Sequence, residues 1–293
     1  MYDSTTTRVV RGVLIGIGIA AALIFFLFPI YWIVLASFKT KLEVSSPTPL
    51  HLFQFTPNLD NYAVVLGLKK QGPMAAGSPG DFMGRLVNSI IIAGASTFLS
   101  VLFGTLTAYA MARFRIPGKS DILFYILSSR MLPPVVIIIP IFIMFTALGL
   151  AQSYVGLTIM YTVINIPFVV WMMKGFFDEI PHEYEDAAML DGYPRVQAFF
   201  KVTLPNAWPG IAATAVFCVI VAWNEYVFAF ILNSKAAVST VPTFIAANFQ
   251  GTAGINWGPI AAMATLFVLP VFIFTFLVRN HLLRGVTFGA VRR

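Results

Sequence analysis

Long apolar segments separated by short polar stretches dominate this chain. Six segments carry few charged residues, and they span about residues 13–37, 86–112, 121–148, 155–175, 207–232 and 259–279. Each is long enough to cross about 30 Å of hydrocarbon as a helix. Because lipid offers no hydrogen-bonding partners, the backbone of such a segment has to pair with itself, which favours helices. The pattern therefore predicts an all-α membrane protein with six transmembrane helices, in a domain over residues 13–279.

Proline and small residues indicate how these helices bend and pack. The third segment contains Pro133, Pro134 and Pro140, which predict a bend there. On the second segment, small residues recur every fourth position, at Ser100, Gly104, Ala108 and Ala112. Such a ridge lets two helix backbones approach closely, so we expect it to pack against a neighbouring helix.

The first apolar segment follows Arg8 and Arg11 and lies close to the N-terminus. Basic residues before an apolar run also describe a secretory signal peptide, whose apolar core has about 7–15 residues. The run at 13–37 is longer than that. We therefore expect an uncleaved first span, preceded by a short polar segment at residues 1–12.

The composition argues against a soluble protein. Hydrophobic residues make up 58% of the chain and charged residues 11%, whereas soluble proteins have about 25% charged residues. The formal charge of +7 fits the tendency of Lys and Arg to collect on cytoplasmic loops, a rule in which long loops weigh little. Most of the basic residues that would lie on the other side of the membrane belong to one long loop, 38–85. Both termini, the tail 280–293 and the loop 181–205 are therefore expected in the cytoplasm, and the loop 38–85 on the opposite side.

Few residues offer the chemistry of an enzyme or a metal site. The single cysteine, Cys218, excludes an intrachain disulfide and a cysteine-only metal centre. Gly118-Lys119-Ser120 resembles the end of a phosphate-binding loop, but Arg113 occupies the position that requires the first glycine. We therefore predict no catalytic residues, no metal site and no nucleic-acid partner for this chain.

A polar, acidic island at 181–205 interrupts the apolar pattern. Pro181 suits the first position of a helix, and the acids that follow it complement the helix dipole. Gly192 is suited to end that helix in a left-handed conformation, and a second short helix is expected from Pro194 until Leu204-Pro205 stops it. From the residues alone, the island is either a docking surface for another protein or an amphipathic linker packed under its own bundle.

The spacing within the island carries a resemblance. The pattern Asp186-Ala187-Ala188-x3-Gly192-x9-Val202-x-Leu204-Pro205 resembles the EAA loop of ABC importer permeases, whose consensus is Glu-Ala-Ala-x3-Gly-x9-Ile-x-Leu-Pro. Asp replaces Glu and Val replaces Ile at unchanged spacing. Further segments resemble the second permease subunit of maltose-type carbohydrate importers: Asn88-Ser89, Ala108–Phe114, Pro117-Gly118, Trp223–Tyr226 and Gly285–Val291.

The resemblance implies an ABC type I importer permease fold in the bacterial cytoplasmic (inner) membrane, crossing it several times. The solute would be a sugar or sugar-like compound, delivered by an extracytoplasmic solute-binding protein. A second permease subunit would complete a heterodimer, and an ATPase subunit dimer would supply the energy. ATP and magnesium would bind to the ATPase subunits, and this chain would bind no cofactor.

The resemblance also assigns residues to the contact with the ATPase. In the island these are Glu183, Glu185, Asp186, Ala187, Ala188, Asp191, Gly192, Leu204 and Pro205. The two glutamates would add salt links to the ATPase. In the C-terminal tail, the corresponding residues are Arg284, Thr287 and Gly289.

Two charged residues, Arg130 and Glu225, fall within apolar segments. Exposure of either to lipid costs a few kcal/mol, so each should face the protein interior and find a partner. They either line the solute path or fix the bundle as structural groups, and a direct bond between them is a hypothesis. Polar and aromatic residues suited to a sugar provide further candidates for the path, at Asn165, Trp223, Asn224 and Tyr226.

Two other functions remain as alternatives. In the first, the same machinery imports a glycerol phosphate, a polyol or another modified or anionic sugar. The second is a stand-alone secondary transporter, which requires an ion-coupling site and usually more spans.

Overall fold

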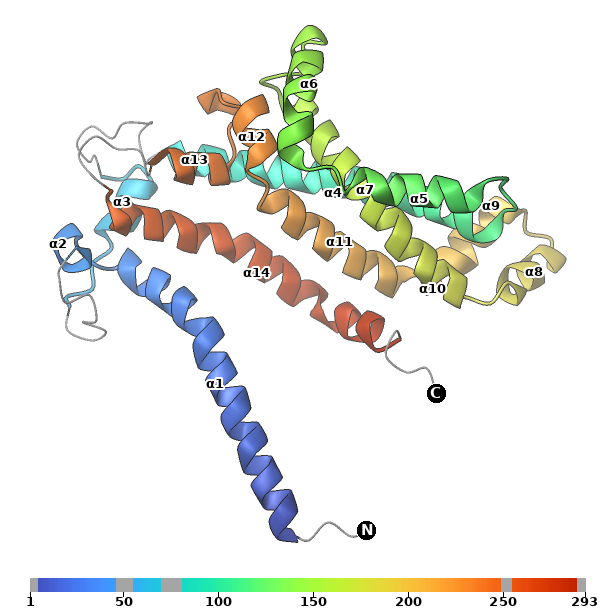
Figure 1. Ribbon diagram of the computed structural model, residues 1–293, viewed down its shortest axis with the longest axis horizontal. Coiled ribbons are helices and arrows are strands. Elements are labelled where there is room, and N and C mark those ends of the chain that lie inside the picture. The colour runs from blue at the N-terminus through green and yellow to red at the C-terminus, as the bar shows by residue number, and fades with distance from the viewer. Residues whose placement is uncertain (1–4, 46–54, 70–80, 249–254, 289–293) are drawn as a thin grey trace. The chain divides into compact units, whose positions relative to one another are not determined.

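The protein is all-helical, as expected (Figure 1). The structure, a computed structural model, describes residues 5–45, 55–69, 81–248 and 255–288, and these form helices joined by turns and loops. The chain divides into two compact units. The first comprises Met1–Phe82 with Ala247–Leu266, and the second comprises Met83–Ala246 with Phe267–Arg293.

The first unit contains α1 (Thr5–Ser37), α2 (Lys41–Val44), α3 (Asp60–Val65) and the beginning of α14 (Trp257–Phe288). One side chain joins the end of α1 to α3. The amide of Asn61 donates hydrogen bonds to the carbonyl oxygens of Ser37, at 2.9 Å, and Lys39, at 2.8 Å. Residues Val10–Ser37 of α1 form a helical stretch long and apolar enough to cross a membrane.

The second unit is organised around α4 (Phe82–Arg113) and α7 (Tyr154–Glu179). Their packing confirms the small-residue ridge predicted on the second segment. The hydroxyl of Ser100 donates to the carbonyl oxygen of Thr162 at 3.3 Å. At Gly104 the approach is so close that an added Cβ would lie 2.5 Å from Cγ1 of Val169.

The third segment is broken before Pro133-Pro134, as predicted, whereas the helix that follows continues through Pro140. It forms α5 (Lys119–Ser129), which lies along α7, and α6 (Pro134–Ala147), which turns away by 91° (Figure 1). Pro133 caps α6 and Pro134 occupies a position in its first turn, where a missing N–H costs nothing. The described residues contain four helices long and apolar enough to cross a membrane, or six if each of two bent pairs forms one span. The count of six spans stays a prediction.

The fifth segment, expected as one helix over 207–232, is instead two. Helix α11 (Trp208–Trp223) ends before Asn224, and α12 (Val227–Leu232) starts again after Tyr226. The Glu225 carboxylate accepts hydrogen bonds from the backbone N–H groups of Phe228, at 2.9 Å, and Ala229, at 3.1 Å. It thereby satisfies the first N–H groups of a new helix, which explains the break. A short 3₁₀ turn, η3 (Ala236–Val238), and α13 (Val241–Asn248) lead on to α14.

Candidate functional site

The island forms the helix, glycine turn and helix expected from its sequence. Its helices are α8 (Glu183–Leu190), α9 (Arg195–Ala198), a π-helix η2 (Phe199–Thr203) and α10 (Leu204–Asn206). Gly192 has φ +91°, the left-handed conformation that glycine adopts readily. The predicted start was wrong by two residues, because the N-cap of α8 is His182 and Pro181 precedes it.

The predicted stop at Leu204-Pro205 was also wrong, because the chain stays helical to Asn206. The reason is the π-helix, in which the N–H of Leu204 bonds to the carbonyl oxygen of Phe199, five residues back. The wider turn relieves the clash that a proline ring causes in a regular α-helix. The chain bends by 72° only afterwards, between Asn206 and the start of α11.

Glu185 faces the protein interior, not the solvent. Its side chain is 6% exposed, and its carboxylate accepts three hydrogen bonds. Oε1 accepts hydrogen bonds from Nε of Arg113 at 2.6 Å and from the hydroxyl of Thr203 at 2.7 Å. Oε2 accepts one from the hydroxyl of Tyr109 at 3.0 Å. We call Tyr109, Arg113, Glu185 and Thr203 the anchor. It replaces the expected salt link from Glu185 to an ATPase, because this carboxylate is already occupied within the chain.

Arg113 extends the anchor to a third helix. Its remaining guanidinium nitrogens donate to the carbonyl oxygens of Phe177 and Ile180, both at 2.9 Å. These carbonyls lie at the C-terminal end of α7, where a helix leaves its last acceptors unpaired. Arg113 itself is the last residue of α4, and its side chain is 2% exposed. One guanidinium group therefore joins α4, α7 and α8.

The electrostatics keep Glu185 ionised. Burial by itself raises the pKa of the Glu185 carboxyl, but hydrogen bonds from Arg113, Thr203 and Tyr109 and the positive charge of Arg113 outweigh burial, so the pKa falls below 4.5. Aromatic rings pack beside the pair, since the ring of Tyr109 lies 4.4 Å from that of Phe199 and 5.7 Å from that of Phe177. The anchor is thus a buried charged pair with several hydrogen bonds, next to aromatic side chains.

The opposite face of α8 is open to solvent. Ala188 shares the inward face with Glu185 and is 6% exposed, whereas Leu190 is 89% exposed. The other predicted contact residues are mostly exposed: Glu183, Asp186, Ala187, Asp191, Gly192 and Pro205 are open to solvent, and Leu204 is partly buried. In the C-terminal tail, Gly289 and the side chains of Arg284 and Thr287 lie outside the described residues.

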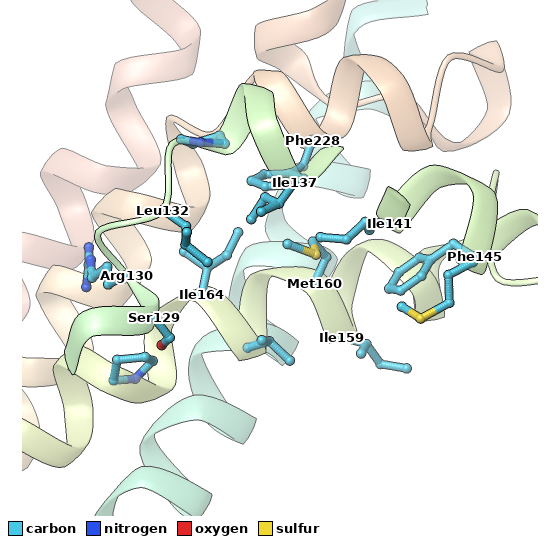
Figure 2. A pocket seen from close by; sticks show the side chains of 14 residues that line it. Ser129, Arg130, Leu132, Ile137, Ile141, Phe145, Ile159, Met160, Ile164 and Phe228 are labelled. Carbon is cyan, nitrogen blue, oxygen red and sulfur yellow. The ribbon is translucent and has the colours of Figure 1, made fainter. Parts of the chain in front are cut away.

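A second candidate site is a pocket of about 500 Å³ beside the bend between α5 and α6. Figure 2 shows Arg130 and Ser129 at one end of it and Phe145 and Ile159 at the other. Its walls are otherwise apolar and come from α6, α7 and α12. Of the six residues predicted for the solute path, Arg130 is among those that line this pocket, and the other five are not.

Arg130 and Glu225 do not pair with each other. The guanidinium of Arg130 lies 5.5 Å from the ring of Phe168 and 5.6 Å from that of Phe217, two rings that stack at 3.8 Å. Its Nη1 is buried without a hydrogen-bond partner among the described residues. The Glu225 carboxylate is used to cap α12, so the hypothesis of an Arg130–Glu225 bond was wrong.

The remaining path candidates separate into two groups. Asn165 is fully buried, and its amide donates to the carbonyl oxygen of Cys218 at 3.4 Å. Trp223 stacks on Phe267 and donates to that residue's carbonyl oxygen at 3.1 Å. Both therefore join helices in this conformation. Asn224 and Tyr226 lie exposed at the break between α11 and α12, and their place in a solute path stays a prediction.

The chain is similar to known proteins over most of its length. Residues 100–288 match the family model described as binding-protein-dependent transport system inner membrane component. A sulfoquinovosyl glycerol transport system permease protein from Agrobacterium fabrum is 33% identical over 91% of this chain and 89% of its own length. A trehalose transport system permease protein from Mycobacterium tuberculosis is also 33% identical, over 91% of this chain and 92% of its own.

The fold has counterparts among solved structures. One chain of a bacterial ABC transporter involved in the import of the acidic polysaccharide alginate superimposes with a TM-score of 0.75. The two chains are 21% identical, and the match covers 96% of this chain and 99% of that one. At this level of identity the likeness concerns the fold.

Proposed function

Because the chain belongs to the family of inner membrane components of binding-protein-dependent transport systems, we propose that it imports a sugar or sugar-like solute as one of two permease subunits. The second permease subunit, an ATPase subunit dimer and an extracytoplasmic binding protein complete the transporter. ATP and magnesium bind to the ATPase subunits. This chain supplies the path and the mechanical coupling, and no catalytic residue of its own.

One observation carries the proposal: α8 presents an open face outside the apolar bundle while its inner face is bonded to α4 and η2. Asp186, Ala187 and Leu190 lie on the open face. The small side chain of Ala187 allows another protein to approach closely, and the exposed Leu190 gains by burial in a partner's cleft. Such a helix suits docking by an ATPase subunit in the cytoplasm.

The solute class rests on the relatives. Those compared above are named for sulfoquinovosyl glycerol and for trehalose. Both solutes contain a sugar, but one carries an acidic group and the other is neutral. The shared chemistry is therefore the saccharide, and on this basis we propose a sugar without choosing its charge.

The test uses the complete transporter in proteoliposomes, with the binding protein added outside. Ala187→Phe enlarges an exposed side chain, so it leaves the fold of the chain intact and obstructs the partner. We expect solute-stimulated ATP hydrolysis to fall at least about tenfold, the loss of about 1.4 kcal/mol of coupling. The matched control is Ser120→Phe, which enlarges another small exposed side chain, at the start of α5, and it should leave hydrolysis unchanged.

Two results contradict the proposal. Normal sugar-stimulated hydrolysis by the Ala187→Phe transporter would remove α8 as the docking helix. Uptake by this chain alone, driven by an ion gradient and independent of any ATPase subunit, would identify a secondary transporter instead.

A further inference from the structure

The anchor lies between the docking helix and the membrane helices. We propose that it transmits the displacement of α8 to α4 and α7, with Arg113 as the positioning residue that holds the three helices together. This inference rests on the proposed function, because it requires that an ATPase subunit moves α8. It assigns Glu185 to force transmission within the chain, whereas Asp186 and Ala187 remain on the docking face.

The backbone connections of α8 do not explain how it would transmit movement. Residues 180–182 join it to α7, and residues 191–194, including the left-handed Gly192, join it to α9. The helix has eight residues, a length that is marginally stable by itself in water. Held only by these short non-helical segments, α8 would tilt when pushed, and the displacement would be lost in the loop.

Arg113 provides the firm connection that these segments lack, because of the geometry of its guanidinium group. The guanidinium is a planar group with donors in fixed directions. From α4 it holds Glu185 of α8 on one side and the carbonyl oxygens of Phe177 and Ile180 on the other. Thr203 binds the same carboxylate from η2, so the segment that leads to α11 is joined as well. Movement of α8 therefore displaces α4, α7 and η2 together.

Folding stability alone is a poor explanation for such a group. Removing two charges from water costs about as much as their attraction returns, and well-packed apolar residues often stabilise a protein equally well. Hydrogen bonds fix direction as well as distance, however, and the buried carboxylate and guanidinium together make five of them. This arrangement favours a role in keeping α8 in a fixed orientation to the other helices while the ATPase subunit moves it.

The experiment measures solute molecules imported per ATP hydrolysed by the complete transporter in proteoliposomes. Glu185→Gln keeps the shape of the side chain and removes its charge. Arg113→Lys keeps the charge but cannot reach Glu185 and both carbonyl oxygens with one ammonium group. We expect both variants to co-purify with the ATPase subunits and to import about 5–150-fold less solute per ATP, the range of typical coupling free energies.

Matched controls use exposed residues of the same type close by. Glu179→Gln and Arg115→Lys change side chains that lie on the surface beside the anchor, and they should leave the ratio unchanged. Tyr109→Phe removes one hydrogen bond of the anchor and is expected to lower the ratio by less than Glu185→Gln does.

An unchanged import ratio in Glu185→Gln and Arg113→Lys would overturn the proposal. Loss of the ATPase subunits from all three variants, including the mild Tyr109→Phe, would also overturn it, because the anchor would then merely fold the loop. Failure of the proposed function is separate, since it would appear in the unmodified transporter as absence of sugar-dependent hydrolysis.

Discussion

Gly104 of α4 lies in close contact with Val169 of α7, and these two helices are also joined by Arg113. A Cβ added at Gly104 would lie 2.5 Å from Cγ1 and 2.6 Å from Cβ of Val169, and 3.6 Å from the carbonyl oxygen of Ile166. Ordinary contacts of a Cβ lie at 3.4–4 Å. Because Val169 is fully buried and its Cβ is fixed by the backbone of α7, no change of rotamer removes this overlap.

The perturbation we consider is Gly104→Val. Helices α4 and α7 have to separate by roughly 1 Å, and overpacking of a buried contact costs about 1–3 kcal/mol. Replacing a helical glycine returns a few tenths of a kcal/mol, because valine is only slightly the better helix former. We therefore expect a net loss of about 0.7–2.7 kcal/mol. Combining Gly104→Val with Val169→Gly exchanges the two side chains, and it should recover at least about 1 kcal/mol beyond additivity.

The assay is unfolding of the purified chain in detergent, followed by tryptophan fluorescence against denaturant. The control is Gly94→Val on the same helix, because nothing in the described structure lies within 4 Å of a Cβ added at Gly94. Equal stability of the Gly104→Val and Gly94→Val proteins would refute the close approach of α4 and α7. Strict additivity in the double variant would show that the cost arises elsewhere.

Three further predictions concern the loop and the break in the fifth segment. The pKa of Glu185 is lowered below 4.5. The stability that the ionised carboxylate contributes is therefore fully present above that pH and is lost as the pH falls through the lowered pKa. The stability difference between wild type and Glu185→Gln should be constant over about pH 5–8 and shrink in acid. Gly192→Ala, at φ +91°, should cost about 1–2 kcal/mol, measured by thermal unfolding in detergent. Glu225→Ala removes the cap of α12 and should cost about 1 kcal/mol of stability. The double variant Arg130→Glu with Glu225→Arg should not regain the stability that Glu225→Arg loses by itself. If it did, an ion pair between the two positions would be supported.

Much of the fold could be predicted because lipid limits the options. The length of each apolar segment and the demand for internal backbone hydrogen bonds yield helices, and the positions of Pro133 and Pro134 identify the bend of the third segment. The break at Glu225 was missed for a physical reason. An acidic side chain near an apolar helix suggests a buried charge seeking an opposite charge, whereas here it binds backbone N–H groups and starts a new helix.

The candidate site was predictable in position but not in the orientation of its side chains. The spacing from Asp186 to Pro205 identified the loop, yet sequence alone treated Glu183 and Glu185 alike. Spacing does not separate the two glutamates, because Glu185 shares a face of α8 with Ala188 and Glu183 shares one with Ala187, and only Glu185 is buried. The partner of Glu185 is Arg113, 72 residues earlier. The burial therefore depends on how α4 and α8 meet and is not visible in either segment.

Helix α8 carries acids on both faces, and the two sets have different roles. A helix of eight residues cannot order itself, so its order has to come from contacts with the bundle. Apolar contacts alone would leave it free to slide, because they have little direction, whereas the bonds of Glu185 to three groups on α4 and η2 specify one orientation. Only when the inner face is fixed in this way do exposed residues such as Asp186 and Leu190 form a defined surface. Docking on the outside therefore depends on the charge that is buried on the inside.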